Sequence, residues 1–424
     1  ALTGSERALP DRFLEAVWHR KELVNGPQPA DGACLVILDG QGVGRRVADA
    51  LADAGITSVT AAAGEALPDL GGVRTVLDLS ALGADGSLER AERDARALLA
   101  LAQSLPADRP ARLLVVSTGA ESVLTGEAAA PARAVLPGVV EAIARTLPAL
   151  DVRHVDVTDA VDPADLVREA LTPAADARVA LRDGQRWVCG LRAVDVAARA
   201  DEAGWTSPFR RNGVYVLNNG LDGFGPDLAE FLLARHHARV LLLGRDTVPG
   251  DEKAAALRRL QAVGGDCAYG TGLDALPAAW GEALDGVIHL PADGTAADET
   301  AFAGTLARVE ALAEQAQGRG AAVILFSTTA HAVGGSPASA AEAAFLNALT
   351  LRLAEAGVAV HGAALDAAGT TDAPRGLNTL LAGVRLGRGR LLIGIDETDA
   401  RVRVRRTDGP LEPVTRTAYF TAPR

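Results

Sequence analysis

Short apolar runs alternate with helical patterns along most of the chain, and the whole alternation occurs twice. In the first half, the apolar run 34–39 leads into a glycine-rich turn at 40–44 and then a helical pattern. In the second half, the apolar run 214–217 leads into a turn at 218–225 and another helical pattern. Strands that alternate with amphipathic helices indicate a parallel, doubly wound sheet. The duplication therefore predicts an α/β protein of two tandem Rossmann-like subdomains.

Two further pairs of apolar runs extend the correspondence between the halves. They are 73–79 with 284–290, and 112–117 with 323–327. A chain of 424 residues is also too long for one ordinary hydrophobic core and suits two domains of about 200 residues each. We expect one subdomain over 1–200, a second over 201–408, a crossing between them at 192–212, and a linker over 409–424.

The composition argues against several classes of partner. The net charge is −12 and no cluster of Lys and Arg offsets it, so we expect neither nucleic acid nor an anionic membrane as partner. No apolar run approaches the roughly 18–20 residues of a membrane span, and no signal peptide is visible. The cysteines, Cys34, Cys189 and Cys267, lie far apart, which indicates a reducing cytoplasm with neither disulfides nor a zinc site. Because methionine is absent even from position 1, we expect the chain to be a piece of a longer protein.

The most informative segment is 321–349. Its apolar run at 322–326 predicts a buried strand, and residues 327–329 place three hydroxyl groups at the carboxyl end of that strand. A turn rich in Gly and Pro follows, and an Ala-rich helix is expected to begin at about Ser339. In an open α/β sheet, ligands and reacting groups meet at the carboxyl ends of the strands. This segment is therefore the candidate catalytic segment.

The segment resembles the catalytic segment of the short-chain dehydrogenase/reductases, and most closely that of the ketoreductase domains of modular type I polyketide synthases. Those domains read F-S-S, then a G-S-P turn, then Y-x-x-x-N at the start of a helix. By this resemblance, Thr328 stands at the catalytic serine, Ser339 at the tyrosine and Ala343 at the asparagine. Arg308 is the best match to the active-site lysine of the family.

No tyrosine lies in or near this segment. The tyrosines of the chain are Tyr215, Tyr269 and Tyr419. A ketone reductase must give a proton to the developing alkoxide, and a serine or threonine hydroxyl is a much weaker acid than a phenol. The general acid of the reductase is therefore missing. Ser339 also has a second interpretation as the N-cap of the helix, because serine is favoured at that position.

The resemblance covers nearly the whole chain. The segment 13–18 resembles the opening strand of those domains, and 180–188 resembles their A-L-R-x-G-x-R-W-V strand. The resemblance implies that 1–200 is a structural subdomain without a cofactor site and that 201–408 is the catalytic-type subdomain. It also implies that 409–424 leads towards an acyl carrier protein.

The turn at 218–225 stands where the family binds NADPH with a T-G-x-x-x-G-x-G motif. Such a turn lets backbone N–H groups meet the diphosphate at a helix N-terminus. Asn219 replaces the first glycine, whereas Gly223 and Gly225 remain. Arg245 matches the arginine that binds the 2′-phosphate of NADPH, and a surface arginine without that role is the alternative.

Further departures from the family pattern alter this site. Asp222 adds a negative charge beside the diphosphate position, and Tyr269 stands near the aspartate that contacts adenine. The H-A-A-G strand end becomes HLPA at 289–292, which adds bulk where the nicotinamide ribose would lie. We expect no bound cofactor, although the parent family uses NADP(H). The first-half turn at 40–44 is interpreted as a tight strand–helix turn rather than a second nucleotide site.

These observations leave three functions open. The leading hypothesis is a redox-inactive ketoreductase domain of a polyketide synthase, within polyketide antibiotic biosynthesis. It leaves the 3-ketoacyl thioester unreduced and spaces the neighbouring domains and the acyl carrier protein. The second is an epimerase of 2-substituted 3-ketoacyl-carrier-protein thioesters, with Thr328, Ser339 and His331 as candidate acids and bases. His331 has a suitable ordinary pKa of about 6.5, or it is simply an exposed loop residue. The third is an active NADPH-dependent reductase with displaced catalytic groups.

Overall fold

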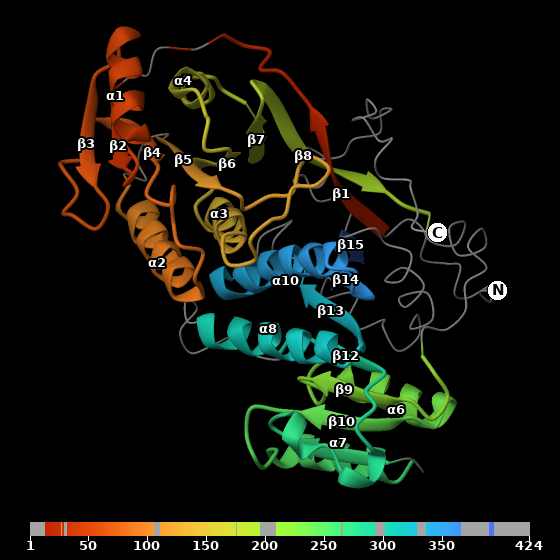
Figure 1. Cartoon of the computed structure of the whole chain (residues 1–424). Coiled ribbons are helices and arrows are strands. Elements are labelled where there is room, and N and C mark those ends of the chain that lie inside the picture. Colours follow the sequence, from red (N-terminus) through yellow and green to blue (C-terminus); the bar gives the residue numbers. More distant parts are fainter. Residues whose placement is uncertain are drawn as a thin grey trace.

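A computed structural model gives the fold of the chain (Figure 1). It describes residues 13–26, 28, 32–105, 111–174, 176–195, 209–263, 266–292, 302–328, 336–365 and 390–393. His331 and the expected linker at 409–424 lie outside these described residues.

The first half of the described chain contains eight strands and four helices. They are β1 (Phe13–Arg20), β2 (Ala33–Leu38), α1 (Val43–Asp53), β3 (Ser58–Ala62), β4 (Val73–Asp78), α2 (Leu88–Ser104), β5 (Ala111–Thr118), α3 (Val135–Thr146), β6 (Leu150–Val157), α4 (Pro163–Leu171), β7 (Arg178–Arg182) and β8 (Gln185–Ala193).

The second half repeats the alternation of strands and helices. Its elements are β9 (Val214–Asn218), α6 (Gly225–His236), β10 (Arg239–Leu243), α7 (Asp251–Gln261), β11 (Cys267–Gly270), the short 3-10 turns η3 (Leu273–Ala275) and η4 (Ala278–Trp280), β12 (Gly286–His289), α8 (Ala303–Gly318), β13 (Ala322–Thr328), α10 (Pro337–Glu355), β14 (Val360–Leu365) and β15 (Arg390–Ile393).

All of these strands belong to one continuous sheet, in the order β11-β10-β9-β12-β13-β14-β15-β1-β8-β7-β6-β5-β4-β2-β3. The strands of the second half, β9 to β15, run parallel to one another, and β15 pairs antiparallel with β1. The first half is parallel from β3 to β7 and ends in the antiparallel strands β8 and β1. Because β1 pairs with both β8 and β15, the first strand of the chain joins the two halves. The α/β fold with two Rossmann-like halves is confirmed.

The strand order reverses at β9. From β9 the chain passes to β10 on one side, and after β11 it returns to β12 on the other side. The carboxyl ends of β9 and β12 therefore form a topological switch point, which is where open α/β sheets bind their ligands.

The two halves are also held together by helices. Helix α3 of the first half packs along α10 of the second (Figure 1). A Cβ atom on Gly138 would lie only 2.3 Å from the carbonyl oxygen of Ala340 and 2.9 Å from Cβ of Ala344. The two helix backbones therefore approach to a distance that only glycine permits. One hydrophobic core contains buried side chains from both helices, including Val139 and Phe345.

The segment 180–188 differs from its expected form, because it is a hairpin rather than one strand. β7 ends at Arg182 and β8 begins at Gln185. Asp183 and Gly184 between them have φ angles of 50° and 70°. Positive φ at both central residues is the geometry of the tight turns that join antiparallel strands. Because only two residues separate β7 from β8, the sequence pattern of the two strands runs on almost without interruption and resembles one strand.

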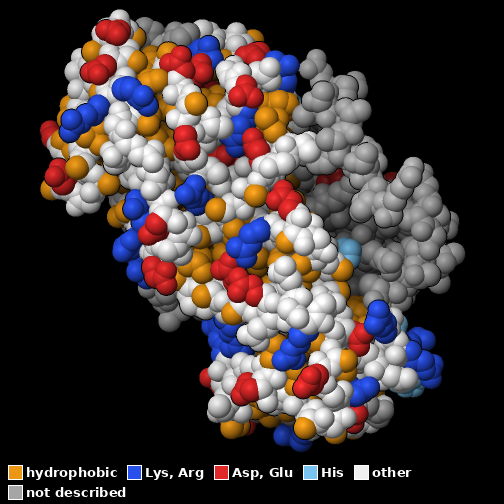
Figure 2. All heavy atoms as spheres, in the orientation of Figure 1, with side chains coloured by type: hydrophobic (Ala, Val, Ile, Leu, Met, Phe, Trp, Pro, Cys, Tyr) orange, Lys and Arg blue, Asp and Glu red, His pale blue; other side chains and the backbone are white. Residues whose placement is uncertain are grey.

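Within the described ranges, no helix is long and apolar enough to cross a membrane. Figure 2 shows acidic and basic side chains interspersed over the face that it presents.

Candidate functional site

The turn after β9 keeps the backbone of a glycine-rich turn although Asn219 replaces a glycine. Asn219 and Gly223 have φ angles of 59° and 52°, in the left-handed region that asparagine tolerates better than most residues. A Cβ on Gly225 would lie 2.6 Å from the carbonyl oxygen of Gly220, so the turn closes tightly on the start of α6. Among the described residues no side chain caps α6. Its N-terminus therefore keeps the electrostatics that favour an anion.

Protein atoms fill the space beside this turn. Leu290 is 1% exposed, and its Cδ1 lies 3.0 Å from the position of a Cβ on Gly225. Asn219 Nδ2 donates a hydrogen bond of 2.8 Å to the Leu290 carbonyl, which ties the turn to the end of β12. Asp222 is buried and pairs with Lys253 of α7. These contacts surround the turn with side chains from the end of β12 and from α7.

The candidate residues Arg245 and Arg308 lie on the side of β9 where β10 and β11 end. Arg245 follows β10 and is exposed. Arg308 of α8 donates hydrogen bonds of 2.9 Å to the carbonyls of Gly244 and Thr271. Burial, and then the nearby positive charge of Arg245, lower the pKa of Arg308. Thr328 ends β13, on the other side of β9 and β12, so the structure does not bring Arg308 to Thr328.

The candidate Ser339 lies inside the first turn of α10. Ser336 is the N-cap, and its Oγ accepts a hydrogen bond of 3.2 Å from the backbone N–H of Ser339. The interpretation of Ser339 as the cap is therefore wrong, because the N-cap lies three residues earlier, at Ser336. The Ser339 hydroxyl donates to the Ser336 carbonyl at 3.0 Å. Thr328 is half-buried and pairs in register with Leu365 of β14.

A chain of three polar side chains lies at the switch point. Asn218 and His289 are register partners at the ends of β9 and β12, and Asn218 Nδ2 lies 2.8 Å from His289 Nδ1. His289 Nε2 lies 3.1 Å from Oε1 of Glu342 on α10. His289 is 1% exposed, whereas the Glu342 side chain is 20% exposed. The sequence placed Asn218 and His289 beside the cofactor position, but it did not single out Glu342. The available signal was one acid among the small apolar residues that begin α10.

The glycine-rich turn of the first half is occupied by its own carboxylate. Asp39 accepts hydrogen bonds from the backbone N–H groups of Gln41, Val43 and Gly44 at 2.7, 3.2 and 2.6 Å. Burial alone raises the pKa of Asp39, but these N–H groups lower it below its ordinary value. Because the carboxylate already takes the donors at the start of α1, this geometry supports the interpretation of the turn as structural.

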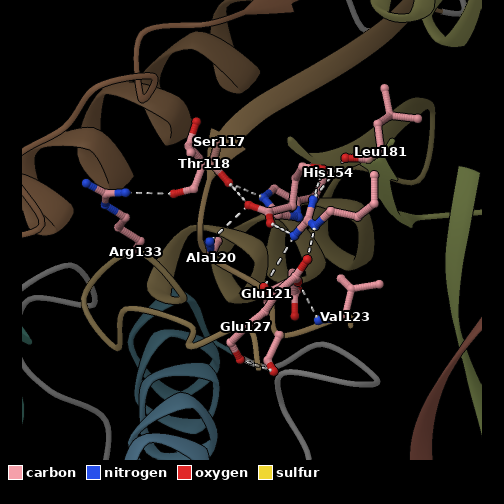
Figure 3. A network of polar contacts seen from close by, with 12 residues as sticks. Ser117, Thr118, Ala120, Glu121, Val123, Glu127, Arg133, His154 and Leu181 are labelled. Carbon is pink, nitrogen blue, oxygen red and sulfur yellow. Dashed lines mark hydrogen bonds and ion pairs between the residues drawn. The ribbon is translucent and has the colours of Figure 1, made fainter. Parts of the chain in front are cut away.

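A buried polar network lies at the carboxyl ends of β5 and β6 in the first half (Figure 3). Ser117 Oγ lies 2.8 Å from His154 Nε2 and donates to Asp156 at 3.0 Å. The Arg182 guanidinium pairs with Asp156 at 2.7 Å and with Glu127 at 2.8 Å. Burial lowers the pKa of His154 to about 4. In a catalytic triad the carboxylate accepts a hydrogen bond from the histidine, whereas here Asp156 accepts one from Ser117. The cluster is therefore interpreted as structural, because its hydrogen bonds and ion pairs join β5, β6 and the β7–β8 hairpin.

Among the described residues, no group of three or more His, Cys, Asp and Glu side chains is arranged to hold a metal ion.

Comparison with known proteins identifies relatives by sequence. No model of a known protein family matches the chain. It is 33% identical over 225 residues to polyketide synthase ThaG of Burkholderia thailandensis, a match that covers 49% of this chain and 4% of that protein. It is 32% identical over 158 residues to a phenolphthiocerol/phthiocerol polyketide synthase of Mycobacterium tuberculosis, covering 36% of this chain and 8% of that protein. The homologues are polyketide synthases, of which this chain spans a small part.

Solved structures resemble the chain over nearly its whole length. "Structure of A-type Ketoreductases from Modular Polyketide Synthase" gives a TM-score of 0.68 at 19% identity and covers 98% of this chain and 100% of that one. The first ketoreductase of the tylosin PKS gives 0.69 at 18% identity, covering 95% and 99%. The fold is that of a polyketide synthase ketoreductase domain. A keto acid-selecting NRPS module that contains a ketoreductase gives 0.75 at 18% identity, covering 94% of this chain and 40% of that one. At such identities the shared ketoreductase fold leaves the activity open.

Proposed function

We propose that this chain is a redox-inactive domain with the ketoreductase fold, which leaves a 3-ketoacyl thioester unreduced and serves a structural role in a polyketide synthase. The observation that carries the proposal is the state of Ser339, which stands where the resemblance puts the general acid. Its hydroxyl donates to the Ser336 carbonyl within the first turn of α10. A hydroxyl engaged in this way is a poor proton donor to an alkoxide.

The position of Arg308 supports the same conclusion. In a reductase a cation beside the phenol stabilises the developing negative charge. Here the Arg308 guanidinium is bound to backbone carbonyls at the ends of β10 and β11, away from Thr328 and Ser339. Neither a proton donor at Ser339 nor a cation at Arg308 is therefore available for a reduction beside Thr328.

The cofactor site adds a second line of support. NADP(H) in the parent family would lie over the turn at 218–225, but Leu290 packs against Gly225 there and Asn219 is bound to the Leu290 carbonyl. The exposed Arg245 still fits a 2′-phosphate, and the N-terminus of α6 still favours an anion. A positive charge is thus retained, whereas Asn219 and Leu290 place bulkier side chains at the turn than glycine and alanine would, which argues against a bound dinucleotide.

The structural role follows from how the halves are joined. The shared sheet through β1 and the close contact of α3 with α10 make one packed body of both halves. The relatives are far longer polyketide synthases, of which the chain spans 4% and 8%. We infer that this body spaces neighbouring synthase domains and an acyl carrier protein in the cytoplasm.

Titration with NADPH tests the proposal directly. The change in NADPH fluorescence is followed as the chain is added, with an active polyketide synthase ketoreductase as positive control. The same samples are then incubated with a 3-ketoacyl thioester, and the 3-hydroxy product is sought by mass spectrometry. We expect neither binding nor product. A saturable binding curve at micromolar protein, or any NADPH-dependent hydroxy product, would overturn the proposal.

A second candidate function, α-epimerisation of the 3-ketoacyl thioester, is favoured by one specific observation. Glu342 carries a partly exposed carboxylate within the candidate catalytic segment, one helical turn after Ser339. Epimerisation needs proton transfer but no hydride, so it is compatible with a redox-inactive site.

A further inference from the structure

The side chains of Asn218, His289 and Glu342 form one hydrogen-bonded chain that runs from the buried sheet to a partly exposed carboxylate. Asn218 and His289 lie at the switch point, where β9 and β12 end. Glu342 reaches them from α10, whose first turns pass the end of β13. Three separate elements therefore converge on this chain.

The hydrogen bonds fix the roles of the ring nitrogens of His289. The Asn218 amide donates from Nδ2 to Nδ1, so the ring proton resides on Nε2 and is donated to Oε1 of Glu342. The contact with the buried His289 ring orients the carboxyl group of Glu342. His289 is 1% exposed and its ring is held from both sides, so the carboxylate is presented in one orientation.

The hydrogen-bonding groups of these three side chains are not all satisfied. Asn218 is 2% exposed, and its buried Oδ1 has no hydrogen-bond partner among the described residues. A buried unsatisfied acceptor costs stability and calls for an explanation beyond packing. A base that is oriented by a second group, itself oriented by a third, is the arrangement used for proton abstraction at active sites.

We propose that Glu342 is the general base of a proton-transfer site for carbon acids, with His289 and Asn218 as its positioning residues. The substrate class is a thioester with an acidic C–H between two carbonyl groups. The Glu342 carboxylate takes that proton, the C–H electron pair becomes the enolate, and the carboxylic acid returns a proton to the same carbon. No electrons are exchanged with a redox partner. Return to the same face after the carboxylic acid exchanges its proton with water replaces the hydrogen, and a proton taken from water on the opposite face inverts the carbon.

This proposal rests on the proposed redox-inactive state, because hydride transfer would consume the same ketone. The test keeps the two apart. A carrier-protein-bound 2-methyl-3-ketoacyl thioester labelled with deuterium at C2 is incubated with the full chain, without NADPH and then with it. Label loss and hydroxy product are both followed by mass spectrometry. A reduced product would refute the proposed function, whereas label retention would refute the base alone.

Substitutions of Glu342 test its role as the base. Glu342→Gln is expected to slow deuterium loss about 100-fold or more, because general base catalysis contributes about 10²–10⁴. Acetate should partly restore exchange to Glu342→Ala, which a merely structural role for Glu342 would not predict. The matched control is Glu355→Gln, on the exposed end of the same helix, which should exchange at the wild-type rate.

His289 is tested by comparing two substitutions. His289→Leu removes the donor to Glu342 and should slow exchange at saturating substrate about 10-fold with little change in KM. His289→Gln retains an N–H donor and should recover part of that loss. Urea unfolding of each variant accompanies the assay. If the Glu342→Gln variant folds and exchanges at the wild-type rate, or if the wild type exchanges no faster than free thioester, the proposal is wrong.

Discussion

The contact between α3 and α10 makes a sharp prediction for Gly138→Ala. In an isolated helix this substitution stabilises by about 1 kcal/mol, because glycine is the poorer helix former. In this protein the new methyl group would lie 2.3 Å from the Ala340 carbonyl oxygen and 2.8 Å from its carbonyl carbon. Both are backbone atoms of α10, so no side chain can rotate away. The two helices must separate by about 1 Å before the atoms return to ordinary contact distances.

The free energy lost when the helices separate exceeds the free energy gained from the better helix propensity of alanine. Overpacking a tight contact costs about 1–3 kcal/mol or more, and here it also loosens the packing of the core that both halves share. We expect Gly138→Ala to lower the free energy of unfolding by about 1–3 kcal/mol, read from the shift in the midpoint of urea unfolding. Because the contact joins the halves, the variant should also be cut faster by trypsin.

Gly304 of α8 is the matched control. It is exposed, and a Cβ at this position would meet no atom within 4 Å. Gly304→Ala should therefore raise the unfolding midpoint, by up to about 1 kcal/mol. If Gly138→Ala is as stable as wild type, the two helix backbones do not approach as described, and the argument that the halves form one rigid spacer fails with it.

Three further predictions concern the polar network and the closed turn. The contribution of His154 to stability should fall as pH falls from about 6.5 towards 4, because burial lowers its pKa to about 4 and the unfolded chain takes up the proton first. Burial raises the pKa of Asp156 to about 6, which acts in the opposite direction, so the wild type is compared with His154→Gln. His154→Gln should lose less stability, or gain more, than the wild type as pH falls over that range, and an unchanged slope would contradict the linkage. Arg182→Leu leaves the carboxylate of Asp156 buried without its guanidinium, so urea unfolding should report a loss of about 3–5 kcal/mol; a loss below about 1 kcal/mol would mean that the pair is solvated. The double variant Asn219→Gly with Leu290→Ala should quench or enhance NADPH fluorescence where the wild type does not, and failure to do so would show that bulk beside the turn is not what excludes the cofactor.

The alternation of apolar runs and helical patterns was sufficient to predict the parallel sheet and its duplication. The run 34–39 became β2 and the run 214–217 became β9, each followed by a tight turn and a helix. Those patterns are local, because burial on both faces of a parallel strand leaves a continuous apolar run. The position of β1 between β8 and β15 is not local, since it depends on pairings with residues far away in the chain.

The site was harder to predict for the same reason. The contact between His289 and Glu342 joins residues 53 positions apart, so no local pattern predicts it. Ser336 and Ser339 are both reasonable helix caps, and only the backbone geometry of the turn chooses Ser336. A resemblance to a family motif matches positions in the sequence, but it does not predict which groups a long side chain such as that of Arg308 contacts.

The two glycine-rich turns are closed in physically different ways. In the first half, Asp39 binds three backbone N–H groups, so a phosphate would meet a carboxylate already in its place. Removing that carboxylate would leave the donors unsatisfied rather than create a pocket. In the second half, no side chain among the described residues caps the start of α6, so the helix dipole still favours an anion there, and Leu290 packs against Gly225. A carboxylate closes the first turn, whereas the side chains of Asn219 and Leu290 close the second. The second half is therefore the half in which nucleotide binding should be recoverable by substitution.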